Sequence, residues 1–321
     1  MKANGRLPVN VVILAEGEEE VGSENLLPFV ERNVDRLAAA AIVISDSTMF
    51  APGMPTIGAS LRGLAYFEIH VEGPSQDLHS GSYGGAVVNP ANALARIIAS
   101  FHDENGRVAI EGFYDDVAAA PEFADRIRAL PFDDEAFRAE VGAPALGGEA
   151  GYGTLERLWV RPTLDVNGLL SGYTGEGSKT VLPARAMAKV SCRLVPDQDP
   201  ERIQELFEAH VRRVAPEGVK VTVRVLHGGE AWKARLEGRL YEAAGRALER
   251  AFGRAPVYAG EGGSIPIVSP FERVLGAPVL LMGFGLPGDN ALAPDELMSF
   301  ENFEKGTHAS AALLTELGVD G

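Results

Sequence analysis

Four glutamates follow a short apolar segment near the start of the chain: Glu16, Glu18, Glu19 and Glu20. The segment before them, residues 11–14, consists only of Val, Ile and Leu, which is typical of a strand buried on both faces of a sheet. A helical pattern begins soon after them, with apolar side chains at Leu26, Leu27 and Val30. The glutamates are therefore expected at the turn where a buried strand leads into a helix, which is where open α/β sheets bind ligands.

A second apolar run, residues 41–44, is followed by Asp46. Strand, helix and strand over this length predict a right-handed βαβ unit, which brings the ends of both strands to one edge of the sheet. Asp46 is then expected close to Glu19 and Glu20. Carboxylates at such an edge suit a divalent metal, with a spare glutamate acting as base on a metal-bound water. The alternative is a solvated acidic turn, because negative charge is favoured at the start of a helix.

Length, composition and charge exclude several classes of protein. The 321 residues, 46% of them hydrophobic, are enough for two domains with sizeable cores. A net charge of −16 argues against binding to nucleic acid or to an anionic membrane. The longest apolar run, residues 37–44, is far shorter than the roughly 20 residues of a membrane span. The single cysteine, Cys192, allows no internal disulfide, and no signal-peptide pattern opens the chain, so we expect a cytoplasmic protein.

Hydrophobic periodicity divides the rest of the chain. Strands are predicted at residues 65–71, 186–195 and 219–225, and helices at 90–101 and 201–214. These elements predict a separate α+β domain over residues 63–229, ferredoxin-like in its order of elements. Residues 49–61 are rich in Gly and Pro and are predicted to form a connector. The α/β character returns with a helix at 236–252, a strand at 279–282 and a helix at 300–317. We therefore predict one α/β domain (1–62 and 230–321) interrupted by an inserted domain (63–229).

Five motifs, taken together, give the chain a family resemblance. They are Glu16–Ser23, Ser45–Asp46, Asp77–Gly81, Arg193–Pro196 and Glu261–Pro266. In this order they resemble the co-catalytic zinc metallopeptidase family of carnosine dipeptidases, carboxypeptidase G, aminoacylases and succinyl-diaminopimelate desuccinylase, and above all its dipeptidase branch. The resemblance implies a catalytic α/β/α domain, here incomplete, with an inserted ferredoxin-like dimerisation (lid) domain. It also implies a pair of zinc ions, a homodimer and a small peptide-like substrate.

The resemblance also implies a role for seven residues. Glu19 matches the general base, Glu20 and Asp46 match metal ligands, His79 matches a histidine that stabilises the oxyanion in the partner subunit's site, Arg193 matches a residue that binds a substrate carboxylate, and Glu261 and Ser264 match substrate-contacting positions. Taken alone, His79 would be an ordinary surface histidine, and Arg193 a member of a cross-strand ion pair.

Two departures from the family pattern concern the metal site. The family has a further segment before the position of Val9, with a His-x-Asp motif and a bridging aspartate. Its last metal ligand is a histidine in an Asp-Asn-Ala-His-Ala-Pro context, where this chain has Leu292. Of the family's metal-holding side chains, only Glu20 and Asp46 are matched here. We therefore expect a truncated chain with weak or incomplete zinc binding and little or no hydrolysis. The alternative is a non-catalytic relative that dimerises or binds peptide-like ligands.

Overall fold

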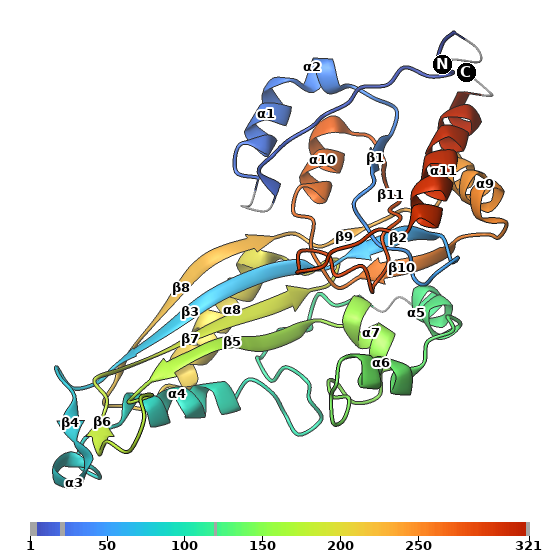
Figure 1. Cartoon of the computed structure of the whole chain (residues 1–321). Helices are drawn as coiled ribbons and strands as arrows, with labels where there is room; N and C mark the ends of the chain where they lie inside the picture. The colour runs from blue at the N-terminus through green and yellow to red at the C-terminus, as the bar shows by residue number, and fades with distance from the viewer. Residues whose placement is uncertain (1–4, 20–22, 119–120, 319–321) are drawn as a thin grey trace. The chain divides into compact units, whose positions relative to one another are not determined.

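A computed structural model of the chain describes residues 5–19, 23–118 and 121–318, which fold as two compact units. Unit 1 takes the described chain up to Leu61, Asp125–Leu130 and the chain from Trp232 onward. Unit 2 takes Arg62–Ala124 and Pro131–Ala231. Figure 1 follows the chain through both units, and the boundary after Ala124 falls within helix α5 (Pro121–Arg128).

The sheet of unit 1 mixes parallel and antiparallel pairs. Its strands are β1 (Ile42–Ile44), β2 (Thr56–Leu61), β9 (Trp232–Lys233), β10 (Val257–Glu261) and β11 (Val279–Leu281). The order is β1-β11-β2-β10, with β9 paired to β2. The pairs β1–β11 and β2–β10 are parallel, whereas β11–β2 is antiparallel. The ends of β1 and β11 therefore reach the same edge of the sheet, as parallel strands require.

Two groups of helices pack against this sheet. The long helices α9 (Arg239–Phe252) and α11 (Phe300–Gly318) share the main core of unit 1 with β2 and β11. The shorter helices α1 (Leu26–Arg32), α2 (Val34–Leu37) and α10 (Val268–Leu275) gather around a second cluster. Figure 1 shows the two groups on either side of β1 and β11. Within the described ranges, no helix is both long enough and apolar enough to cross a bilayer.

Unit 2 is built on a four-stranded antiparallel sheet. Its main elements are β3 (Gly63–Glu72), α4 (Pro90–Ala99), β5 (Thr163–Ser171), β7 (Arg185–Leu194), α8 (Pro200–Val214) and β8 (Lys220–Gly229). The strand order β5-β7-β3-β8 confirms the predicted ferredoxin-like arrangement. Both helices contribute to one core with the strands, in which the ring of Phe67 on β3 stacks on that of Phe207 on α8 at 4.2 Å.

Shorter elements complete unit 2. They are β4 (Leu78–His79), α3 (Ser80–Tyr83), α6 (Asp134–Glu140), α7 (Thr154–Trp159) and β6 (Val181–Leu182). Strands β4 and β6 pair with each other and not with the main sheet. Figure 1 shows this small pair beyond the ends of β3 and β7.

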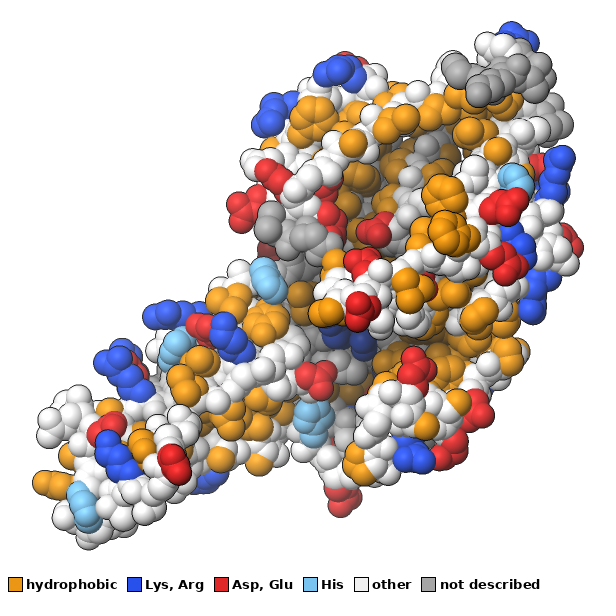
Figure 2. Space-filling view, in the orientation of Figure 1, with side chains coloured by type: hydrophobic (Ala, Val, Ile, Leu, Met, Phe, Trp, Pro, Cys, Tyr) orange, Lys and Arg blue, Asp and Glu red, His pale blue; other side chains and the backbone are white. Residues whose placement is uncertain are grey.

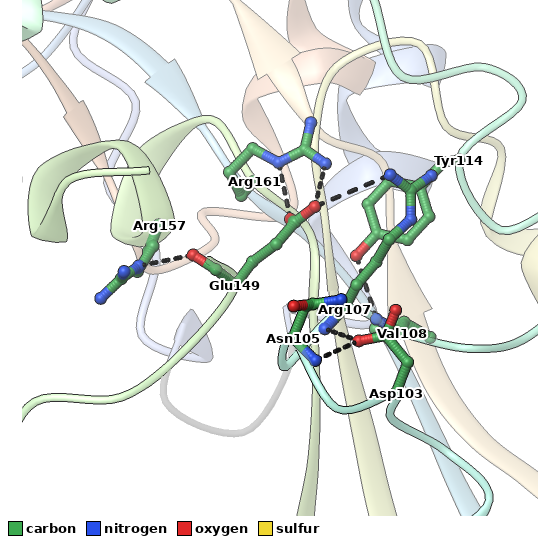
Figure 3. A network of polar contacts seen from close by, with 8 residues as sticks. All are labelled: Asp103, Asn105, Arg107, Val108, Tyr114, Glu149, Arg157 and Arg161. Carbon is green, nitrogen blue, oxygen red and sulfur yellow. Dashed lines mark hydrogen bonds and ion pairs between the residues drawn. The ribbon is translucent and has the colours of Figure 1, made fainter. Parts of the chain in front are cut away.

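A buried ion pair stabilises the long segment between α4 and β5 (Figure 3). Glu149, which is only 8% exposed, accepts hydrogen bonds from Nε and Nη2 of Arg161 at 2.8 and 2.7 Å. Arg107 lies 3.9 Å from the same carboxylate and 3.8 Å above the ring of Tyr114. Glu149, Arg161 and Arg107 each face an opposite charge or an aromatic ring, so we assign these three residues a structural role.

The first predicted strand does not form. Residues 11–14 run extended but are not part of a strand, and Ile13 is 85% exposed. The prediction of a strand buried on both faces is therefore wrong for this structure. A strand needs a neighbour for its backbone hydrogen bonds, and among the described strands none pairs with residues 11–14, since β1 pairs only with β11.

The predicted connector at residues 49–61 contains a strand. β2 lies between β11 and β10, and all six of its residues are buried. Gly58, one of the glycines in this range, allows close packing: a Cβ there would lie 2.7 Å from Cβ of Leu281 on β11. The prediction of a connector is wrong for residues 56–61.

Candidate active site

The segments that follow β1 and β11 are held side by side. The hydroxyl of Ser45 donates to the carbonyl of Met282 at 3.0 Å, and the amide of Met49 donates to the carbonyl of Gly285 at 2.8 Å. A Cβ at Gly283 would overlap the backbone of Ser47. Asp46 is therefore fixed on a short stretch of backbone that packs tightly against the Gly-rich turn after β11.

The end of β10 brings a second carboxylate to this edge. Glu261 accepts hydrogen bonds from the amide of Thr48 at 3.2 Å and from its hydroxyl at 3.4 Å. Burial, and to a lesser degree the charge of Asp46, raise the pKa of Glu261 above its ordinary value. Ser264 follows in the turn between β10 and α10 and is half-buried. The structure thus groups Asp46 with Glu261, and it adds Thr48, which the sequence analysis did not identify.

A cavity of about 410 Å³ lies in unit 1 beside β1. Glu16, Glu19 and Asp46 contribute to its lining, while most of the wall is apolar and comes from α1, β1, α10, Val12 and Leu14. In the view of Figure 2, hydrophobic side chains cover much of unit 1, with acidic side chains among them. The predicted proximity of Glu19 and Asp46 is therefore reproduced to the extent that both line one cavity. Glu20, the other predicted metal ligand, lies outside the described residues.

Two of the four glutamates have local structural roles. Glu16 accepts hydrogen bonds from the amide of Glu18 and from the hydroxyl of Ser23, at 3.0 and 2.8 Å. Glu18 accepts from the side-chain amide of Asn25, at 2.9 and 3.0 Å. For these two residues the alternative interpretation, an acidic turn that leads into a helix, fits the structure.

The described side chains do not make up a metal site. Among them, no group of three or more His, Cys, Asp or Glu residues is placed to hold an ion. Leu292 is 79% exposed, with a left-handed backbone (φ 61°), and its side chain offers no lone pair to a metal. The carboxylates of Asp46 and Glu261 are fewer donors than a tight zinc site requires.

In unit 2, His79 is oriented by two hydrogen bonds. Its Nδ1 accepts the amide of Gly81 at 3.1 Å, and its Nε2 lies 3.1 Å from the hydroxyl of Thr180. Because Nδ1 acts as an acceptor, we assign the proton of the neutral ring to Nε2. Thr180 was missed by the sequence analysis, since it lies 101 positions from His79 and nothing local marks it.

Arg193 belongs to a charged group on the four-stranded sheet of unit 2, near the start of β3. It lies on β7, opposite Leu64 of β3 and Thr163 of β5. Burial, and to a lesser degree the charge of Arg193, lower the pKa of Arg62 to about 10, while Asp165 has the opposite effect. Arg62, which the sequence analysis did not single out, therefore adds a second guanidinium beside Arg193.

His79 and Arg193 of one chain are far apart. Arg193 pairs with Leu64 at the start of β3, whereas His79 comes after β3 has ended at Glu72. At about 3.3 Å per residue, this length of strand separates them by roughly 25 Å or more. A dipeptide is too short to contact both side chains in one copy of unit 2.

Comparison with known proteins agrees with the motifs. Residues 59–219 match the family model of the M20 peptidase dimerisation domain. The chain is 34% identical to the Cys-Gly metallodipeptidase of Schizosaccharomyces pombe, over 97% of this chain and 66% of that protein. It is 31% identical to the human Beta-Ala-His dipeptidase, over 97% of this chain and 62% of that protein. The chain thus spans about two thirds of the length of these relatives.

Solved structures extend the likeness to the whole fold. The dipeptidase Dug1p of Saccharomyces cerevisiae superposes with a TM-score of 0.84 at 31% identity, covering 99% of this chain and 68% of that one. The α/β fold with an inserted dimerisation domain is thereby confirmed. The motifs, the matched domain and this superposition together place the chain in the M20 metallopeptidase family, in its dipeptidase branch.

Proposed function

We propose that the function of this chain is the metal-dependent hydrolysis of dipeptides. We also propose that its hydrolysis is impaired, because Leu292 occupies a position where the family has a metal ligand. The observation that carries the proposal is the grouping of Asp46, Thr48 and Glu261 where β1, β11 and β10 end, beside a cavity that Glu19 also lines. Ligands of open α/β sheets bind beyond such strand ends. The two relatives described above, which cover 97% of this chain, are dipeptidases by name.

Individual residues take the following roles in this proposal. Glu19 acts as the base that accepts a proton from the attacking water. Glu20 and Asp46 would contribute carboxylates to a zinc ion, for which the described donors are too few, and Leu292 would add none. Arg193 holds the carboxylate of the dipeptide through its planar guanidinium, and Glu261 and Ser264 contact the rest of it.

The separation of His79 from Arg193 supports a homodimer. If both contact one dipeptide, they must come from different copies, because about 25 Å or more of β3 lies between them within one chain. His79 then acts in the partner subunit's site, where its Nε2–H stabilises the developing oxyanion. We further propose a cytoplasmic location and domain boundaries at residues 62 and 229.

Leu292, which weakens the proposal of hydrolysis, favours a second candidate function. Leu292 replaces a metal-ligating histidine, and the described residues include no three-donor group. A non-catalytic relative would keep the dimer and bind peptide-like ligands through Arg193 and Ser264 without cleaving them.

Restoring the missing imidazole distinguishes the two functions. We would measure zinc content after dialysis, and hydrolysis of Cys-Gly and β-Ala-His, for the wild-type chain, Leu292→His and Leu297→His. Leu297 is a matched control, since it lies in the same loop and is 54% exposed. We expect little zinc and little turnover for the wild type and for Leu297→His, with a gain of both for Leu292→His. No gain in Leu292→His favours the non-catalytic function, and full activity of the wild type contradicts the proposed impairment.

A further inference from the structure

Arg193 lies on the face of the unit 2 sheet that does not enter the core. Its neighbours on β7, Cys192 and Leu194, are fully buried and belong to the core of unit 2. Because successive side chains of a strand point to opposite faces of the sheet, Arg193 and Ser191 lie on the other face. Arg193 is only half-buried there, as a residue that contacts a substrate must be.

Strand β5 brings a carboxylate to the same face. Thr163 lies directly opposite Arg193, and Asp165 lies opposite Ser191, two residues farther along β5. The hydroxyl of Thr163 donates to Oδ2 of Asp165 at 3.2 Å, which orients the carboxylate on this face. Residues that are diagonal neighbours on adjacent strands lie about 7–8 Å apart, so Asp165 is close to Arg193.

Asp165 is exposed, and its charge acts on the surroundings of Arg193. Burial, and to a lesser degree the charge of Asp165, raise the pKa of the Cys192 thiol. Burial and then Arg193 lower the pKa of Arg62, and Asp165 acts on it in the opposite direction. A ligand held by Arg193 would therefore lie in the electrostatic field of the Asp165 carboxylate.

We propose that Asp165 determines the specificity of this site for the C-terminal residue of the dipeptide. The inference rests on the proposed function, in which Arg193 holds the carboxylate of the dipeptide. The C-terminal side chain starts at the carbon that bears this carboxylate, so its end comes within about one Debye length of Asp165, about 10 Å at 0.1 M salt. Asp165 repels a second carboxylate there and attracts a cation. The favoured substrates are thus dipeptides with a neutral or basic C-terminal residue.

Two dipeptides that differ by one charge test this inference. Gly-Gln and Gly-Glu have nearly the same shape, and only Gly-Glu carries a second carboxylate. In calorimetric titration of the full chain at about 0.1 M salt, we expect the wild type to bind Gly-Gln roughly tenfold more tightly than Gly-Glu. For Asp165→Asn we expect nearly equal affinities, because Gly-Glu binds more tightly while Gly-Gln is unchanged. For Asp165→Lys we expect Gly-Glu to be the preferred dipeptide.

Glu72→Gln is a matched control on the same face of the sheet. Glu72 is 46% exposed and lies at the end of β3, whereas Leu64, the residue opposite Arg193, lies near its start. At about 3.3 Å per residue, this length of strand separates Glu72 from Leu64 by roughly 26 Å, which is well beyond the Debye length. We therefore expect Glu72→Gln to keep the wild-type ratio of the two affinities.

The possible results separate this inference from the proposed function. An unchanged ratio in Asp165→Asn, with both dipeptides still bound, would overturn the role of Asp165 alone. Equally tighter binding of both dipeptides by Asp165→Asn would also overturn it, because Asp165 would then compete with every substrate for Arg193. A lost preference in Glu72→Gln would show a general effect of net charge instead. A wild type that binds neither dipeptide would contradict the proposed function and this inference together.

Discussion

At the end of β10, the carboxylate of Glu261 accepts two hydrogen bonds from Thr48 and lies within electrostatic reach of Asp46. Burial, and then Asp46, raise its pKa above the ordinary value of 4.5. The ionised form therefore costs stability. This cost is absent below pH 4.5, where folded and unfolded chains are both protonated, and it is complete once the pH has risen through the raised pKa.

We expect Glu261→Gln to raise the free energy of unfolding at pH 7, because glutamine keeps an oxygen for Thr48 and removes the charge. The gain should shrink as the pH falls toward about 4, where the wild-type carboxyl is itself neutral. Urea unfolding at pH 7 and at about pH 4 measures this gain in the free energy of unfolding. Glu301→Gln is the control of opposite sign, because Lys305 lowers the pKa of Glu301. A variant less stable than wild type at pH 7 would show that the charge of Glu261 stabilises the fold.

At the scale of the elements, Gly283 packs directly against the segment that follows β1. A Cβ at Gly283 would overlap the Ser47 backbone, so Gly283→Ala must displace the stretch that carries Asp46. We expect a loss of about 1–3 kcal/mol in the free energy of unfolding, as for overpacked sites. Gly288→Ala, in the same turn but with no described atom within 4 Å of its added Cβ, should be nearly neutral in the same urea titration. Equal stabilities would contradict this packing.

The Glu149–Arg161 pair gives a second prediction for the elements it joins. Both side chains are nearly buried, at 8% and 11% exposure, and Glu149→Gln would leave the guanidinium without its counter-charge. We expect a loss of about 3–5 kcal/mol in the free energy of unfolding. The exposed pair Glu135–Arg138, at 3.0 Å, is the control, and Glu135→Gln should cost less than about 1 kcal/mol. A small effect at Glu149 would show that water replaces its carboxylate easily.

The elements that were predicted correctly each show a regular pattern of apolar side chains within their own sequence. The alternation along β3, β7 and β8, and the apolar stripes of α4 and α8, are visible in each segment alone. The errors at residues 11–14 and 56–61 both concern pairing, which depends on a distant partner. The site shows the same division: Asp46 and Glu261 were identified by their motifs, but the hydrogen bond that groups them joins Thr48 to a residue 213 positions away.

For the whole molecule, the sheet of unit 2 separates two predicted substrate contacts within each chain. In a two-fold dimer, Arg193 of one copy and His79 of the other would serve the same ligand, so each site would be built from both chains. No variant of a single residue tests this arrangement, because the loss of either contact would weaken binding wherever its partner lies.

Mixing two defective variants does test it. His79→Ala and Arg193→Met should each lose binding of Cys-Gly in calorimetric titration. After subunit exchange in an equal mixture, random pairing in two-fold dimers restores about a quarter of the wild-type sites, since mixed dimers bring the intact His79 of one chain to the intact Arg193 of the other. If both residues served one site within a single chain, no mixture would contain an intact site. The stoichiometry of the mixture therefore decides between the shared site and the separate one.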